Sequence, residues 1–296
     1  MRIGYLGLGQ MGGALARRLQ ASYPLKVFDL NPAAVKRLVD AGASACTSGR
    51  ELGQNCDVVF TCLQTSDQVE AAIFGEHGLA SGMMAGGLIV DQTTGDAHVT
   101  RRMAARLKDK KLELMDAPVS GGPQFAAAGT IAIMAGCTAQ QYARIEPALK
   151  SVSPNVFHCG DIGTGHVAKV CNNLMAASQR LLTFEVIALA VKNGLAPEQA
   201  VEVMLKSSGR NYTLDVTMRR HILTGKLFQG FTLGLMHKDV GLAMQLAASS
   251  GVPLFFGGLV RQFYQSIINE KGADADVNYA VKVFERLANV QITPAD

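Results

Sequence analysis

The chain has 296 residues, of which 48% are hydrophobic and 18% are charged, and its formal net charge at pH 7 is +4. This length allows one large domain or two ordinary ones, and the composition is that of a folded protein with a full core. So small a net charge gives no support to binding of nucleic acid or of an anionic membrane. We therefore expect a globular protein with neither partner.

Neither a metal site nor a targeting segment is evident. The six cysteines include no C-x-x-C pair, which favours reduced thiols over a disulfide framework or a metal cluster. Residues 1–13 are glycine-rich and lack the apolar core of a signal peptide. No uninterrupted apolar run reaches the roughly 18 residues of a membrane helix. We therefore expect a cytoplasmic protein that uses no metal.

In the first half of the chain, short apolar strands alternate with helical segments. The expected strands are residues 2–6, 25–29, 58–63, 88–91, 112–115, 130–135 and 155–159. The expected helices are residues 11–21, 32–41, 68–74 and 97–107. Continuous apolar strands that alternate with helices indicate a parallel, doubly wound sheet with both faces buried.

The pattern changes after Gly160. Residues 167–193 contain no proline or glycine and carry apolar side chains on almost every face, which predicts one long buried helix of roughly 40 Å. Further helices are expected at residues 197–207, 235–249, 259–270 and 276–288. The chain is thus expected to divide near residue 163. An α/β domain (1–163) is joined by a long interdomain helix to an all-helical domain (164–296).

A glycine-rich turn follows the first strand. Gly7, Gly9 and Gly12 enclose Gln10 and Met11 in the pattern G-x-G-x-x-G, between an expected strand and an expected helix. The first glycine of such a turn allows the tight bend, the second admits a pyrophosphate, and the third allows close helix–strand packing. The helix start then offers N–H groups to the phosphates. The pattern predicts a Rossmann domain that binds a dinucleotide.

Asp29, at the end of the second strand, lies twenty residues after Gly9. A carboxylate at this place hydrogen-bonds the adenosine ribose and repels a 2′-phosphate, and no arginine follows it directly. We therefore expect NAD as the cofactor and NADP less so. The alternative is that Asp29 merely caps the turn at Asn31 and Pro32.

Another glycine turn follows a later strand, in the segment D-A-P-V-S-G-G (116–122). Ser120, Gly121 and Gly122 would present a hydroxyl and backbone N–H groups in a concave nest suited to a carboxylate. An ordinary glycine turn is an equally good interpretation of these residues taken alone.

Polar residues also mark the start of the long helix, in G-H-V-A-K-V-C-N-N (165–173). Lys169 and Asn173 are four residues apart and share one helix face. Polar groups in an otherwise apolar helix are costly to bury without a purpose. The alternative is a solvated helix start, and His166 and His237 are interpreted as packing or surface residues.

Together with H-K-D (237–239), these segments make the chain similar to the β-hydroxyacid dehydrogenase family, which includes 3-hydroxyisobutyrate dehydrogenase and tartronate semialdehyde reductase. The resemblance spans essentially the whole chain. It implies hydride transfer between NAD and the primary alcohol of a small C2-substituted 3-hydroxy acid, the reverse reaction reducing a semialdehyde. It also implies a homodimer or homotetramer assembled through the helical domain.

The resemblance assigns roles residue by residue. Lys169 would be the general acid/base, Asn173 would orient the substrate, and residues 120–122 would hold its carboxylate. Lys238 would contact substrate or cofactor, and Phe231 would flank the nicotinamide. Two further positions match the cofactor lining of the family, namely Leu63 and Thr94.

Two departures leave the substrate open. The segment 91–94 reads D-Q-T-T where a serine-rich version is usual, and residues 207–212 match the 3-hydroxyisobutyrate branch only in part. An imine reductase of the same architecture is one alternative, although it usually has another residue at the place of Lys169. A cofactor-binding module without turnover is the other.

Overall fold

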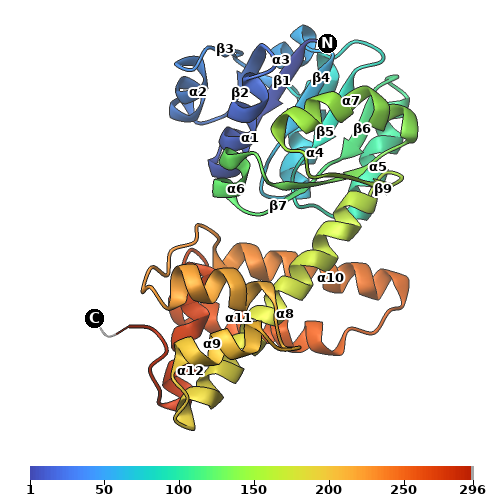
Figure 1. The fold of residues 1–296 in the computed structure, drawn as a ribbon. Helices are drawn as coiled ribbons and strands as arrows, with labels where there is room; N and C mark the ends of the chain where they lie inside the picture. Colours follow the sequence, from blue (N-terminus) through green and yellow to red (C-terminus); the bar gives the residue numbers. More distant parts are fainter. Residues whose placement is uncertain (295–296) are drawn as a thin grey trace. The chain divides into compact units, whose positions relative to one another are not determined.

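The computed structural model describes residues 1–294, and it consists of two compact units (Figure 1). The first comprises Met1–Lys169 and contains the sheet. The second begins at Val170 and is helical. The long helix α8 (Thr164–Lys192) starts in the first unit and continues through the second. This is the expected class of fold, an α/β unit followed by an all-helical unit.

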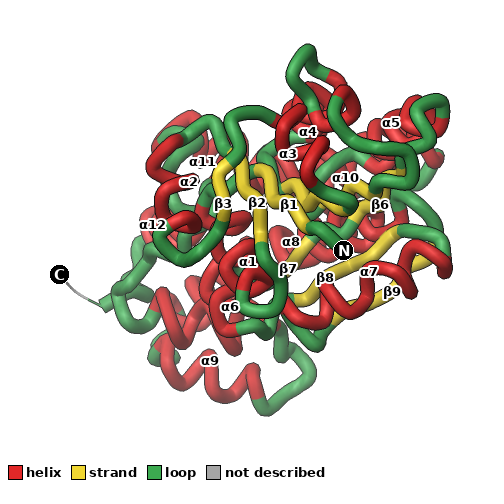
Figure 2. Tube along the Cα trace, turned by 90° about the horizontal axis from the view of Figure 1, so that it is seen from above, coloured by secondary structure: helices red, strands yellow, loops and turns green. Residues whose placement is uncertain are grey.

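The sheet of the first unit has the strand order β3-β2-β1-β4-β5-β6-β8-β7, with β9 paired to β8, and Figure 2 shows its first strands side by side. The strands are β1 (Ile3–Leu6), β2 (Leu25–Phe28), β3 (Ser44–Ala45), β4 (Val58–Thr61), β5 (Leu88–Asp91), β6 (Glu113–Asp116), β7 (Val119–Ser120), β8 (Ala132–Gly136) and β9 (Val156–Gly160). The chain reverses direction across the sheet between β1 and β4, a switch point at which doubly wound sheets bind ligands.

Strands β1 to β6 are parallel, as expected, but the sheet is not parallel throughout. Strand β8 is antiparallel to β6 and to β7, and only β9 is parallel to β8. The physical reason is the length of the connection. Ten or so residues from β7 to β8 suffice for a reversal, whereas a parallel crossover needs a dozen or more.

Helices cover both faces of the sheet. They are α1 (Gln10–Gln20), α2 (Pro32–Val39), α3 (Gly49–Asn55), α4 (Ser66–Phe74), α5 (Ala97–Lys108), α6 (Pro123–Ala128) and α7 (Ala139–Val152). Ile3 and Tyr5 of β1 pack into one apolar core, and Leu6 packs into the other. Because successive strand residues face opposite sides, burial on both faces produces the continuous apolar strands seen in the sequence.

The second unit is built around α8. Its other helices are α9 (Pro197–Leu205), a π-helical segment (Thr213–Ile222), α10 (Leu233–Ser250), α11 (Phe255–Lys271) and α12 (Ala280–Ala288). Phe184 of α8 and Tyr264 of α11 are fully buried in the core that these helices share.

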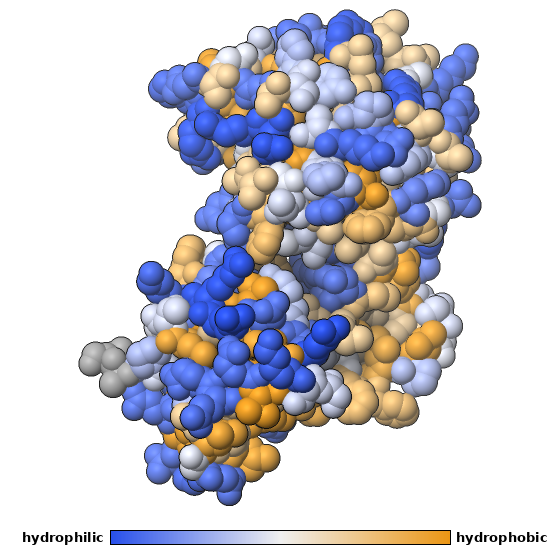
Figure 3. Space-filling model, viewed as in Figure 1, coloured by the Kyte–Doolittle hydropathy of each residue, from blue (hydrophilic) through white to orange (hydrophobic). Residues whose placement is uncertain are grey.

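Helix α8 is not buried on every side, contrary to expectation. Met175, Leu182 and Leu189 are exposed, and their spacing of seven residues places them in one stripe. By length and composition α8 is also apolar enough to cross a membrane. Its opposite side, with Phe184 and Ile187, forms the core of the folded helical unit. Other apolar patches lie on the surface of this unit (Figure 3).

Candidate active site

The glycine loop has the geometry of a phosphate-binding turn. Gly7 has φ +91°, a left-handed conformation that favours glycine. A Cβ on Gly12 would lie 2.0 Å from the carbonyl oxygen of Gly7, so helix α1 packs directly on the turn. A Cβ on Gly9 would meet no atom within 4 Å, and no side chain caps α1. The start of α1 thus lacks a side-chain cap, and an uncapped helix start of this kind suits an anion.

Asp29 comes directly after β2 and is joined to this loop. Its Oδ2 atom accepts the N–H of Leu8 at 2.5 Å, and its Oδ1 atom accepts the N–H of Asn31 at 2.7 Å. Asp29 therefore does brace the turn into α2, as the alternative interpretation held. The same bonds place a carboxylate beside the glycine loop, where a ribose diol would be recognised.

Two other expected cofactor positions lie at the carboxyl ends of β4 and β5. Leu63 donates its backbone N–H to the hydroxyl of Thr93 at 3.0 Å, and Thr94 follows Thr93 at this edge of the sheet. Thr93 in turn donates its N–H to the buried Asp91 at 3.0 Å. Both segments are thereby held at the sheet edge that carries the glycine loop.

Gln92, which departs from the serine-rich pattern of the family, is buried and has a structural partner. Its Oε1 atom accepts the hydroxyl of Tyr5 at 2.6 Å, and Tyr5 is fully buried in β1. Gln92 therefore links β5 to the strand before the glycine loop. His166 is also buried, with its Nε2 atom 3.7 Å from Oδ2 of Asp91, consistent with a packing role.

The expected carboxylate nest lies between β7 and α6. Ser120 ends β7 and is half-buried, while Gly121 and Gly122 have φ +144° and +86°. Both glycines have the positive φ that other residues rarely adopt. The backbone of these residues is therefore shaped by glycine, as the proposed anion nest requires.

Asp116, at the end of β6, fixes the start of α8. Its Oδ1 atom accepts the N–H of Gly163 at 2.6 Å, and its Oδ2 atom accepts the N–H of His166 at 2.7 Å. Burial raises the pKa of this carboxyl, while His166 and the two N–H groups act in the opposite direction. Lys169 lies one turn further along α8 and is 7% exposed. The sequence alone assigned no role to Asp116, although this residue begins the segment D-A-P-V-S-G-G.

Asn173 lies one turn beyond Lys169, within a polar network of the helical unit. Its Nδ2 atom donates to Oδ2 of Asp239 at 2.6 Å, and its Oδ1 atom accepts from Asn172 at 3.1 Å. The Nζ atom of Lys238 lies 3.0 Å from Oδ1 of Asp239. Asp239 is 2% exposed and joins two residues expected to contact substrate. The sequence placed Asp239 in the segment H-K-D but gave no indication of its role.

Phe231 precedes α10 and is half-buried against the core of the helical unit. Its carbonyl oxygen accepts the N–H of Val277 at 2.8 Å. The neighbouring N–H groups of Gln229 and Gly230 donate to Asp276 at 2.7 and 2.8 Å. The backbone of residues 229–231 is therefore held by the side chain of Asp276 and by the backbone of Val277.

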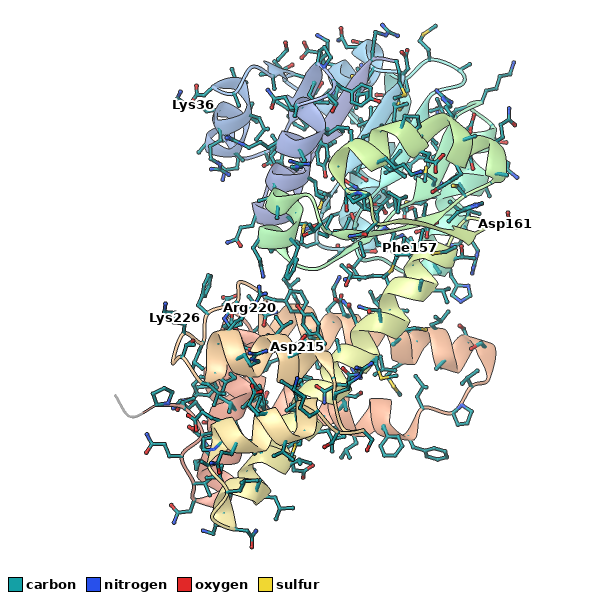
Figure 4. The ribbon with its side chains drawn as sticks, in the orientation of Figure 1. Lys36, Phe157, Asp161, Asp215, Arg220 and Lys226 are labelled. Carbon is teal, nitrogen blue, oxygen red and sulfur yellow. The ribbon has the colours of Figure 1, made fainter. Side chains whose placement is uncertain are left out.

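A cavity of about 380 Å³ also lies in the helical unit. It is lined by Glu202, Leu205, Lys206, Arg210, Asn211, Tyr212, Asp215 and Arg219. Asp215 and the neighbouring Arg220 are labelled on the π-helical segment in Figure 4. None of the residues expected to bind cofactor or substrate lines this cavity, although Asn211 and Tyr212 belong to the divergent segment 207–212.

The described residues fit a nicotinamide dinucleotide. The uncapped start of α1 suits the pyrophosphate, the open side of Gly9 admits it, and Asp29 suits the adenosine ribose. Across residues 1–294, no group of three or more His, Cys, Asp or Glu side chains is placed to hold a metal ion.

Two family models match the chain. The NAD-binding domain of 6-phosphogluconate dehydrogenase matches residues 2–160, and the NAD-binding model of NADP-dependent 3-hydroxyisobutyrate dehydrogenase matches residues 163–284. With the glycine loop and the helical second unit, these matches define a two-domain nicotinamide-dependent oxidoreductase.

Individual relatives narrow this class. A 2-(hydroxymethyl)glutarate dehydrogenase of Eubacterium barkeri is 34% identical over 99% of this chain and 98% of its own length. An NAD-dependent L-serine dehydrogenase of Pseudomonas aeruginosa is 37% identical over 96% and 98%. A solved 3-hydroxyisobutyrate dehydrogenase of Mycobacterium tuberculosis with L-serine has a TM-score of 0.87, at 29% identity over 96% of this chain and 99% of that one. The chain belongs to the β-hydroxyacid dehydrogenase family.

The imine reductase alternative receives weaker support. An imine reductase of Myxococcus stipitatus shares the fold with a TM-score of 0.64, but only 16% of its residues are identical. A likeness at this level concerns the fold alone.

Proposed function

We propose that the protein oxidises the primary alcohol of a small C2-substituted 3-hydroxy acid with NAD, and reduces the corresponding semialdehyde in the reverse direction. The observation that carries the proposal is the placement of Lys169 and Asn173. Both are 7% exposed and lie one turn apart on α8. The carboxylate of Asp116 fixes the start of that helix, and Asp239 orients the amide of Asn173.

A nicotinamide dinucleotide held by the glycine loop and Asp29 would supply the hydride acceptor for the carbinol carbon. Lys169 takes the hydroxyl proton in oxidation and returns it in reduction, since an amine, unlike a guanidinium, can release and accept a proton. Asn173 hydrogen-bonds the reacting oxygen and keeps it beside Lys169. Ser120 and the N–H groups of Gly121 and Gly122 hold the substrate carboxylate.

The names of the relatives support this substrate class. The proteins from E. barkeri and P. aeruginosa are named for 2-(hydroxymethyl)glutarate and L-serine. Both compounds are 3-hydroxy acids, and they differ in the substituent at C2. The two compounds share a carboxylate and a primary alcohol, and these are the groups that Lys169, Asn173 and residues 120–122 would contact. The substituent at C2 is therefore the part of the substrate that remains to be identified.

The proposed preference for NAD over NADP is supported by Asp29, whose carboxylate lies beside the glycine loop. A 2′-phosphate near this carboxylate would be repelled. The exposed side chain that follows it, Leu30, offers no positive charge.

A homodimer or homotetramer is the proposed assembly. It is supported by exposed apolar side chains on two helices of the second unit, Met175, Leu182 and Leu189 on α8 and Phe255, Phe256 and Leu259 on α11. Light scattering coupled to size-exclusion chromatography tests it: a monomer at micromolar concentration would contradict it.

The proposed activity is tested by NAD reduction over a panel of 3-hydroxyisobutyrate, glycerate, serine, threonate and longer C2-substituted 3-hydroxy acids. We expect turnover of at least one member, with higher kcat/KM for NAD than for NADP. A folded protein that binds NAD and turns over no member would instead support the cofactor-binding module without turnover.

A further inference from the structure

Arg180 is a buried cation in the helical unit that the proposed reaction does not use. It lies on α8 and is 4% exposed. Its Nη1 atom donates to Oδ1 of Asn278 and to Oε1 of Gln229, the latter at 3.4 Å. Its Nε atom is buried and has no hydrogen-bond partner among the described residues. Both observed acceptors are neutral amides, so the guanidinium charge is not neutralised by them.

No acidic group among the described residues pairs directly with Arg180. Within residues 1–294, Arg180 forms no ion pair with an aspartate or glutamate at 4 Å or less. Asp276 favours the charged form of Arg180 through space, but its oxygens accept the backbone N–H groups of Gln229, Gly230 and Asn278 and make no direct bond to the guanidinium. A buried arginine cannot shed its charge in the way a lysine can, and burying a charge without a directly bonded partner of opposite charge is costly.

Arg180 lies on the same face of α8 as the two residues that are proposed to act on the substrate. Lys169, Asn173 and Arg180 are separated by four and seven residues, so they lie within a helix stripe about 40° wide. Arg180 is about 10 Å beyond Asn173 along the axis. Long side chains on a helix lean toward its N-terminus, which for Arg180 is the direction of Asn173.

The segment 229–239 connects the surroundings of Arg180 with those of Asn173. Gln229, which accepts a hydrogen bond from Arg180, is two residues before Phe231, and Asp276 holds the backbone of this loop. The loop then leads into α10, which carries Lys238 and Asp239. Two elements therefore carry both groups of residues. Helix α8 carries Asn173 and Arg180, and the segment 229–239 carries their partners Asp239 and Gln229.

We propose that Arg180 binds a second carboxylate, carried by the C2 substituent of the substrate. This inference rests on the proposed function, because it places the reacting carbon at Asn173. The preferred substrates are then dianionic: besides the C1 carboxylate, they carry a second carboxylate at the end of a short chain on C2, and Arg180 binds this second group. Arginine suits this task, since its planar fork can donate two parallel N–H bonds to one carboxylate.

The first test compares matched substrates on the unmodified protein. Three 3-hydroxy acids would carry 2-carboxymethyl, 2-carboxyethyl or 2-carboxypropyl groups, each paired with its terminal carboxamide. The amide keeps the size and removes the charge. We expect at least one acid to exceed its amide roughly 10- to 100-fold in kcat/KM, the range for a hydrogen bond to a charged group. Equal turnover of acid and amide in all three pairs would overturn the inference.

The second test compares Arg180→Met and Arg180→Lys with Arg286→Met. Arg286 is a matched control, because it is exposed and pairs with Glu270 on the surface. In Arg180→Met the acid should lose its advantage over the amide, while kcat/KM for 3-hydroxyisobutyrate changes only a few-fold. Arg180→Lys should keep part of the advantage, and Arg286→Met all of it. An equal loss for acid, amide and 3-hydroxyisobutyrate in Arg180→Met would indicate a purely structural arginine.

The two proposals fail differently. Turnover of monocarboxylic 3-hydroxy acids without any gain from a second carboxylate removes the role of Arg180 and leaves the proposed function intact. Absence of turnover with every 3-hydroxy acid, acids and amides alike, removes both. If Arg180→Met does not fold, the substrate pairs on the unmodified protein still decide the matter.

Discussion

Asn173 of α8 donates a hydrogen bond of 2.6 Å to Asp239 of α10, and both side chains are buried. The bond settles the orientation of the amide: Nδ2 faces Asp239, and Oδ1 faces the other side. An asparagine alone could turn its amide over, whereas here Nδ2 donates to Asp239 and Oδ1 accepts from Asn172. Asp239 is thus a positioning residue for Asn173 and, through its 3.0 Å contact, for Lys238.

Asp239→Asn should lower kcat/KM by roughly 10- to 100-fold, because a buried charge-assisted hydrogen bond and the ion pair to Lys238 are both weakened. Steady-state kinetics with the best substrate measures the effect, and the Kd for NAD checks that the first unit is intact. Asp274→Asn, at an exposed position, is the control. A loss of thermal stability with unchanged kinetics of the remaining folded enzyme would contradict the positioning role.

Lys169→Ala should lower kcat by about 10²–10⁴-fold, the usual contribution of a general acid/base. Lys169→Arg should fail as well, since a guanidinium does not give up its proton at neutral pH. Single-turnover kinetics and NAD binding by fluorescence separate chemistry from folding. Near-normal turnover by a folded Lys169→Ala that binds NAD would rule out the proposed proton transfer and reopen the imine reductase and non-catalytic alternatives.

Replacing Asp29 with Ser and Leu30 with Arg should shift the preference from NAD toward NADP. The repulsion is removed, and a cation arrives at a side chain that is 91% exposed and has room for it. The ratio of kcat/KM for the two cofactors is the measurement, and Leu30→Arg alone is the control. Asp29 also braces two backbone N–H groups, so some loss of stability should accompany the shift. A preference of the unmodified enzyme for NADP would refute the role of Asp29.

Ser120→Ala should raise KM for the acid and leave the Kd for NAD unchanged, because one hydrogen bond to the substrate carboxylate is lost. Methyl esters of the C1 carboxylate should lose most of their kcat/KM on the unmodified enzyme. The exposed Ser22→Ala serves as a control. Equal turnover of acid and ester would remove the carboxylate nest from the mechanism.

Asp116→Asn should destabilise the protein by about 1–3 kcal/mol despite its near-identical size. Both oxygens of Asp116 accept backbone N–H groups. In the asparagine variant, an NH₂ group would replace one of these oxygens and would face a backbone N–H group, so that hydrogen bond would be lost. Urea unfolding of this variant and of the exposed Asp161→Asn measures the difference. Equal stability of the two variants would show that Asp116 does not anchor α8.

The sequence predicted most of the elements because their signals are local. The strands at residues 58–61 and 88–91 are short apolar runs. Pro32 marks the start of a helix, and Gly194 marks the end of α8. Helix α7 was not predicted: it contains Pro147, and much of its surface is polar. The sequence indicated a parallel sheet, which was wrong for β8, because this strand is antiparallel to β6 and β7. The direction of a strand depends on which strands become its neighbours, and its own residues do not reveal that.

The candidate site shows the same limit. The glycine loop and Lys169 stand out because their neighbours in sequence give them context. Asp239 is 66 residues from Asn173, and Asp116 is 47 and 50 residues from the N–H groups that it binds. Nothing local marks these two carboxylates as partners, and burial of Arg180 beside Asn278, 98 residues away, is equally invisible in one dimension.

The continuity of α8 also restricts how the chain can change in length. Lys169 and Asn173 are held about 6 Å apart along one axis by the backbone hydrogen bonds of a single helix. A single-residue insertion between them would rotate Asn173 by about 100° away from the lysine, and a deletion would do the same in the opposite sense. Loops elsewhere in the chain can absorb insertions and deletions, but this stretch can vary only by substitution.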